Sequence, residues 1–165
     1  MVVKNEDVFS QLGLGYLGQF LAERVNELVL AECRRKGFPS LRVSHGYIVQ
    51  HLVTASGPVA RTGSELARRM GVTQQAASKA VAELVRLGVV EIAEAPDKRA
   101  KNIRLTTRGW EGVQYSRRSR RRLEAKLERQ LGMKRYLETR KALRECITTV
   151  GGAGRIQSRR VRQPD

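Results

Sequence analysis

The sequence has little that would anchor it in a membrane or cross-link it. Its two cysteines, Cys33 and Cys146, are too few for a disulfide framework, which favours a reducing compartment. The most apolar stretch, residues 12–21, is interrupted by glycine and far shorter than the ~20 residues that span a bilayer. The amino terminus lacks the basic start and apolar core of a signal peptide. We therefore expect a cytoplasmic protein.

Clusters of residues typical of catalysis or metal binding are also missing. The histidines, His45 and His51, and the cysteines lack the close pairs of zinc sites. For the cysteines we favour buried, inert thiols over a redox switch, because no sequence feature indicates a lowered thiol pKa. Residues 13–18 match GxGxxG, with Glu32 at a suitable distance for a ribose, but the polar residues before them do not read as the buried strand that this motif requires. We expect no enzyme, no metal and no cofactor.

Acidic residues are scarce relative to basic ones. Sixteen Asp+Glu oppose thirty-two Lys+Arg, which gives a formal net charge of +16. The excess is uneven, because residues 1–60 carry a net charge of +1 and residues 61–165 a net charge of +15. Such a field attracts polyanions. Nucleic acid is the commonest of these partners, and nothing favours the alternative, an anionic membrane.

Apolar periodicity predicts helices before residue 60. Between Val8 and Arg35 apolar residues recur at three- and four-residue steps, and Gly37 follows as a stop. Ser44 is placed to cap a second helix that runs to about Ala55. The residues expected to face inward are Leu17, Phe20, Leu21, Val25, Leu28 and Val29 in the first helix, and Tyr47, Ile48, Leu52 and Val53 in the second.

Residues 62–88 have the pattern of a helix-turn-helix. Thr62 and Glu65 have the spacing of a capping box, which predicts a helix over Ser64–Met70 that ends at Gly71. Thr73 can then cap a helix from Gln74 to Leu87, closed by Gly88. A short helix, a glycine-containing turn and a second helix make this motif.

A basic hairpin and two further helices follow. Residues 89–93 and 102–105 read as strands, joined by a polar loop over residues 95–101. Thr106 or Thr107 can cap a long helix over Arg108–Gln130, Gly132 breaks it, and Lys134–Val150 forms the last one. The apolar residues that define these two helices are Leu123, Leu127 and Leu131, then Leu137, Leu143 and Ile147.

This order of elements resembles the MarR family of transcription regulators. The matching stretches are Glu65–Thr73, Val81–Gly88, Pro96–Arg99 and Ile103–Gly109. The resemblance implies a homodimer whose first and last helices interleave, with two recognition helices in successive major grooves of a pseudo-palindromic site and wings over the minor grooves. It also implies that a small aromatic ligand or cysteine oxidation can release the DNA.

We accordingly expect a mainly α protein with a small β-hairpin wing. Its parts are a dimerisation helix (1–40), a winged helix-turn-helix domain that binds DNA (41–107), dimerisation helices (108–150) and a flexible basic tail (151–165). The function expected is that of a sequence-specific regulator of duplex DNA, most simply a repressor. The alternative is an architectural protein that binds DNA with little sequence preference, which the charge alone would permit.

Candidate DNA contacts follow from a helical wheel of ~100° per residue. Ala77, Ala80, Val81 and Leu84 fall on one side of the second motif helix, opposite an outward arc. That arc consists of Gln74, Gln75, Ser78, Lys79, Ala82 and Arg86. We expect Gln74, Gln75 and Ser78 to read bases and Lys79 to meet a base or a phosphate, with Thr73 at the start of the helix included in the interface.

The wing and two helix ends supply further candidates. Arg99 is expected to enter a minor groove, and the resemblance gives Asp97 the role of orienting it. Lys98 and Lys101 are expected to meet phosphates, as are Thr62 and Ser64 at a helix start. Arg117, Arg118, Arg120, Arg121 and Arg122 are expected to form a solvated, self-repelling stretch, with phosphate contact as the alternative.

Overall fold

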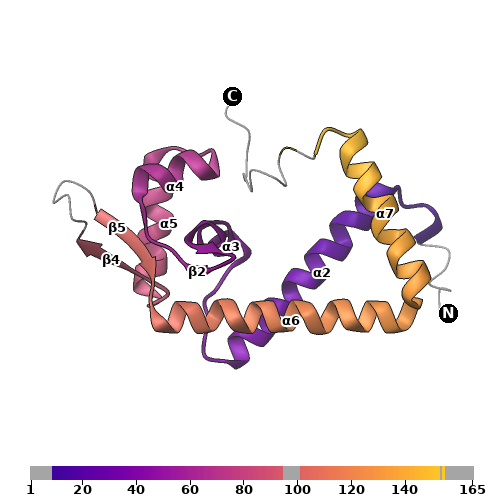
Figure 1. The fold of residues 1–165 in the computed structure, drawn as a ribbon, viewed down its shortest axis with the longest axis horizontal. Helices are drawn as coiled ribbons and strands as arrows, with labels where there is room; N and C mark the ends of the chain where they lie inside the picture. Colours follow the sequence, from indigo (N-terminus) through magenta and orange to yellow (C-terminus); the bar gives the residue numbers. More distant parts are fainter. Residues whose placement is uncertain (1–8, 95–100, 153, 155–165) are drawn as a thin grey trace.

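The computed structural model describes residues 9–94, 101–152 and 154. The fold is mainly helical, with a winged lobe at one end and a long helix that leads away from it (Figure 1). The helices are α2 (Leu14–Arg35), α3 (Val43–Val49), α4 (Gly63–Met70), α5 (Gln74–Arg86), α6 (Thr107–Leu131) and α7 (Met133–Thr149). In the described part of the chain, no helix is long and apolar enough to cross a membrane.

The winged lobe contains two small antiparallel sheets. A short 3-10 turn, η1 (Gln50–Leu52), leads into β1 (Val53–Thr54), which pairs with β2 (Gly57–Pro58). The second sheet has the order β3-β5-β4, formed by Arg61–Thr62, Lys101–Leu105 and Val90–Glu94. The hairpin of β4 and β5 confirms the predicted wing, and β3 on its other edge was not predicted.

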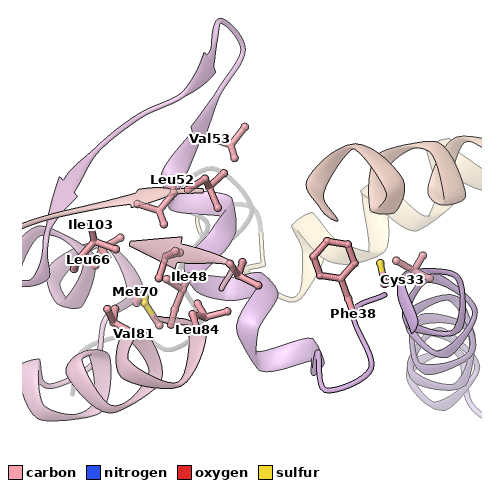
Figure 2. Close-up of a cluster of buried hydrophobic side chains, with 14 residues drawn as sticks. Cys33, Phe38, Ile48, Leu52, Val53, Leu66, Met70, Val81, Leu84 and Ile103 are labelled. Atoms are coloured by element: carbon pink, nitrogen blue, oxygen red, sulfur yellow. The ribbon is translucent and has the colours of Figure 1, made fainter. Parts of the chain in front are cut away.

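The core falls into two groups of buried side chains. In the winged lobe Ile48, Leu52, Leu66 and Leu84 are completely buried and hold α3, α4 and α5 together. Phe38 and Cys33 lie apart from this group, beside α2 and α6 (Figure 2). Phe38 is fixed there by the guanidinium of Arg108, 4.8 Å above its ring, so the loop after α2 is attached to the start of α6.

The two helices of the helix-turn-helix begin as the sequence predicts. The Thr62 hydroxyl accepts a hydrogen bond from the Glu65 amide, and the Thr62 amide donates to the Glu65 carboxylate over 2.9 Å. Gly71 ends α4 in the left-handed region, at φ 68°. The Thr73 hydroxyl accepts from the Ala76 amide at the start of α5. Each cap satisfies amides that a helix start otherwise leaves unpaired.

Several boundaries differ from those expected near the amino terminus. The first helix was predicted from Val8, but α2 begins at Leu14, after a turn that follows Phe9 and Ser10. Ser44 is not a cap: Arg42 holds that position, and the His45 ring accepts a hydrogen bond from its amide. Because α3 ends at Val49 and a strand follows, the predicted helix to Ala55 is wrong.

Some apolar residues predicted to face inward are exposed in the single chain. In α2, Val29 is buried, but Phe20 and Leu21 are 55% and 47% exposed. Leu137 and Ile147 of α7 are exposed as well, as is Tyr47 of α3. Their periodicity follows a helix, yet the surface that would cover most of them is not part of the same chain.

The long helix α6 connects the winged lobe to α7. Thr106 caps it, with its hydroxyl 2.9 Å from the Gly109 amide, and Gly132 separates it from α7 with a φ of 75°. Near this corner the Tyr136 hydroxyl donates to Glu124 over 2.5 Å, which raises the pKa of the tyrosine. In Figure 1, α2 crosses α6, and these two helices share the most extensive helix–helix contact in the described chain.

The GxGxxG match belongs to this helical region. Gly15 and Gly18 lie within α2, so the spacing does not end a buried strand as a dinucleotide site requires. Glu32 forms ion pairs with Arg35 and Arg122. Among the residues with defined positions, no group of three His, Cys, Asp or Glu side chains could hold a metal ion.

Candidate nucleic-acid interface

The outward face of α5 is the main candidate surface. All six residues of the predicted outward arc are exposed, whereas Ala77, Val81 and Leu84 are buried against the rest of the lobe. The burial of this opposite face fixes the rotation of α5. The side chains of Gln74, Gln75, Ser78 and Lys79 therefore lie together on an open polar surface.

The start of α4 borders this surface but is partly occupied. The Thr62 hydroxyl is used for capping and lies 3.1 Å from the Ser64 hydroxyl. The backbone hydrogen bond from Thr62 lowers the pKa of the Glu65 carboxyl, which is consequently ionised at neutral pH. Ser64 is exposed, and it is the more accessible of the two residues expected to meet a phosphate.

The wing contributes one described candidate. Lys101 is exposed at the start of β5. Asp97, Lys98 and Arg99 lie outside the described residues. Next to Lys101 along the hairpin, the Arg104 guanidinium pairs with Glu91 across the strands over 2.7 Å, so this arginine is already held by a carboxylate.

A three-residue cluster joins α5 to α3, and the sequence gave no sign of it. Arg42 pairs with Glu83 of α5, and the buried His45 ring lies with its Nε2 3.1 Å from the other Glu83 oxygen. The His45 ring and the Arg42 guanidinium lower the pKa of the Glu83 carboxyl. Arg42 and Glu83 are 41 positions apart, so no local motif could have indicated their contact.

A family model described as "MarR family" matches residues 41–100. The chain contains a winged helix of the MarR family. This match covers the helix-turn-helix and most of the wing, and it confirms the resemblance drawn from Glu65–Thr73 and Val81–Gly88. No curated protein sequence matches the chain.

Solved structures of regulators share the fold over nearly their whole length. YusO from Bacillus subtilis is 16% identical, with a TM-score of 0.64, and covers 88% of this chain and 99% of its own. MepR, a transcription regulator of the Staphylococcus aureus multidrug efflux pump MepA, is 18% identical, with a TM-score of 0.65, over 84% of this chain and 99% of its own. A complex of MepR with DNA gives 19% identity, a TM-score of 0.60 and the same coverage. The similarity includes the helices outside the MarR-family match.

The arginine-rich part of α6 differs from the solvated stretch expected. Arg120 donates to Asn26 of α2 over 2.9 Å, and Arg122 lies 3.7 Å from Glu32. Arg117 and Arg118 stack over the rings of Trp110 and Tyr115. The expectation of purely self-repelling side chains was wrong, because aromatic and α2 partners on neighbouring turns offset the repulsion.

A cavity of about 440 Å³ lies between α2, α3 and α6 of this MarR-family chain. Apolar side chains, including Val29, Phe38 and Val113, form much of its wall. Its charged lining consists of Arg42, Arg117 and Arg120. This volume falls in the range of small-molecule sites, and the cavity borders the Arg42–His45–Glu83 cluster.

The two cysteines have different surroundings. Cys33 is buried and lines the cavity, and burial raises its pKa although Arg120 acts in the opposite direction. A protonated thiol is a poor nucleophile, which fits the expectation of an inert side chain. Cys146 is only half-buried in α7, so the same expectation was wrong for its burial.

Proposed function

We propose that this protein is a homodimeric regulator that binds a pseudo-palindromic operator in duplex DNA and represses transcription. The observation that carries the proposal is the rotation of α5, which turns Gln74, Gln75, Ser78 and Lys79 outward. Glutamine can bond adenine through two contacts, and lysine can reach guanine or phosphate. Such a regulator acts on bacterial DNA in the cytoplasm and is not an enzyme.

The remaining contacts in this proposal position the protein on the duplex. Thr73 and Ser64 are at helix starts beside the recognition face, with Thr62 next to Ser64, and Lys101 begins the returning strand of the wing. We assign phosphate contacts to these residues and to Lys98, minor-groove contact to Arg99, and the orientation of Arg99 to Asp97. The net charge of +16 supports a strong electrostatic contribution, and MepR, similar in fold, is known in a complex with DNA.

A second copy of the chain is the partner we propose for α2 and α7. The 17-residue α7 has no buried residue, and a helix of this length is marginal in water without a packed face. Its exposed apolar residues and those of the first half of α2 are Met133, Leu137 and Ile147, then Leu14, Tyr16, Phe20 and Leu21. Dimerisation through residues 1–40 and 108–150 would cover them and set the distance between two copies of α5.

We also propose that a small aromatic molecule in the cavity releases the DNA. The cavity adjoins α3, which contacts α5. A ligand can shift the DNA affinity only if it binds one arrangement of these helices better than the other. The cavity lies where such a difference would reach the recognition helix.

The test is a binding titration at physiological salt. The operator is the fragment that the protein selects from a random pool, and the competitor is the same fragment with its sequence scrambled. We expect an operator affinity on the order of nanomolar, at least about a thousandfold tighter than for the scrambled DNA. Comparable affinities would instead indicate an architectural protein without sequence preference.

Two variants connect this specificity with α5. Gln75→Ala and Ser78→Ala should each weaken operator binding by about 1–3 kcal/mol if the side chain contacts a base. Gln130→Ala, an exposed glutamine near the far end of α6, is the control and should leave the affinity unchanged. Unchanged affinity in both α5 variants would contradict the assignment.

A further inference from the structure

Two side chains belong to the cavity and to the attachment of the recognition helix at the same time. Arg42 and His45 line the cavity, and both contact the carboxylate of Glu83 on α5. Glu83 lies one helical turn after Lys79 on the same helix. Any change at the Arg42 guanidinium is therefore shared between the cavity and α5.

The charges of the cavity favour an anionic ligand. Its lining includes three arginines and a histidine but no aspartate or glutamate. Two of these arginines are held elsewhere, Arg120 by Asn26 and Arg117 by the ring of Trp110. Arg42 is held by the carboxylate of Glu83, which another carboxylate could replace with the same chemistry.

The Arg42–Glu83 pair is weak enough to be replaced. The side chains of Arg42 and Glu83 are 60% and 33% exposed, and exposed ion pairs contribute little to stability because water screens them. A ligand that buries an apolar body between α2 and α6 gains free energy which Glu83 cannot match. Competition at the guanidinium would then favour the ligand.

We propose that the cavity binds an aromatic carboxylate, and that its carboxylate group takes Arg42 and His45 from Glu83 and so frees α5 from α3. This inference rests on the proposed function, since it gives the chemical class of the releasing ligand and the contact through which it acts. Loss of the Glu83 contacts removes a polar link between α3 and the recognition helix. The buried contacts of Leu84 and Val81 remain, so α5 stays folded but becomes less restrained.

The experiment compares 2-naphthoate with 2-naphthamide, which has a similar shape and no charge. Calorimetry on the full chain without DNA gives the affinities for wild type, Glu83→Gln and Arg42→Gln. Glu27→Gln is the matched control, because it removes an exposed carboxylate from the Arg24–Glu27 pair away from the cavity. Amide hydrogen exchange of α5, with and without each compound, reports the restraint on the helix.

The expected results follow from the competition. Glu83→Gln should bind naphthoate about two- to fivefold more tightly than wild type, because no carboxylate competes. Arg42→Gln should bind it about tenfold more weakly, because a charge-assisted hydrogen bond is lost. Glu27→Gln should match wild type, and naphthamide should bind wild type and Glu83→Gln equally. Naphthoate should speed amide exchange in α5 of wild type, whereas in Glu83→Gln exchange should already be fast and should not change.

Equal naphthoate affinity in wild type and Glu83→Gln would overturn the inference, as would the absence of naphthoate binding at every soluble concentration. Arg42→Gln gives an independent result if Glu83→Gln fails to fold, since it breaks the same pair at an exposed side chain. None of these readouts contains DNA. An operator titration that fails would therefore refute the proposed function alone, and unselective naphthoate binding beside a successful titration would refute this inference alone.

Discussion

Gly109 is the position where one added methyl group should disturb the junction between the wing and α6. A Cβ atom at this glycine would lie 1.9 Å from the backbone oxygen of Val89 and 3.2 Å from Leu105 Cδ2. The Val89 oxygen accepts a hydrogen bond from the Thr106 amide over 3.1 Å, so the clash falls on the contact that connects the first residues of the wing with the cap of α6.

The size of the effect can be worked out from these distances. Cβ contacts under 3.0 Å are essentially never found, so the two backbone segments must separate by about 1 Å. Overpacking of a well-packed site costs about 1–3 kcal/mol, and a clash with backbone should fall at the upper end. The gain in helix propensity from glycine to alanine is at most about 1 kcal/mol. We expect Gly109→Ala to lower the free energy of unfolding by about 2 kcal/mol after this gain.

Gly63→Ala is the matched control, because it makes the same substitution in the first turn of α4. Its Cβ would meet only Ile103 Cδ1, at an ordinary 3.9 Å, so stability should stay the same or rise slightly. Urea unfolding followed by circular dichroism, at one protein concentration for all variants, measures the difference. An unfolding midpoint for Gly109→Ala equal to that of wild type would refute the reasoning.

Three further predictions concern the dimer, pH and the buried thiol. Phe20→Glu, which places a charge on an apolar residue 55% exposed in the single chain, should convert a dimer to monomers in sedimentation analysis, and an unchanged dimer would exclude α2 from the interface. Because the folded pKa of Glu65 is lowered, its contribution to stability is present above its ordinary pKa of 4.5 and is lost as the pH falls through the folded pKa. Wild type should therefore lose more stability below pH 4.5 than Glu65→Gln in urea titrations, and parallel pH profiles would argue against this. In a Cys146→Ser variant, Cys33 should react with iodoacetamide far more slowly than in urea at the same pH, because burial raises its pKa; equal rates would contradict its burial.

The parts of the fold that were predictable from the sequence are those set by local interactions. The capping box of Thr62 and Glu65, the left-handed Gly71 and the break at Gly132 each depend on neighbouring residues. The same holds for the exposed face of α5, whose opposite side repeats small and apolar residues with a helical period.

The remaining features depend on contacts between distant segments. Strand β3 forms only because β5 offers a free edge, and α3 ends at Val49 because the chain turns into β1. Glu83 looked like an ordinary solvated residue until Arg42 and His45 were seen beside it. Periodicity could also not say whether an apolar face such as that of α7 meets its own chain or a second one.

Methylation protection of the operator by dimethyl sulfate tests the central assignment of α5 most directly. The reagent modifies guanine N7, which lies in the major groove, and adenine N3, which lies in the minor groove. If the exposed face of α5 enters the major groove in a dimer, wild type should protect guanine N7 in two patches about 10 base pairs apart. A stable complex in which every guanine N7 of the operator stays reactive would contradict the account.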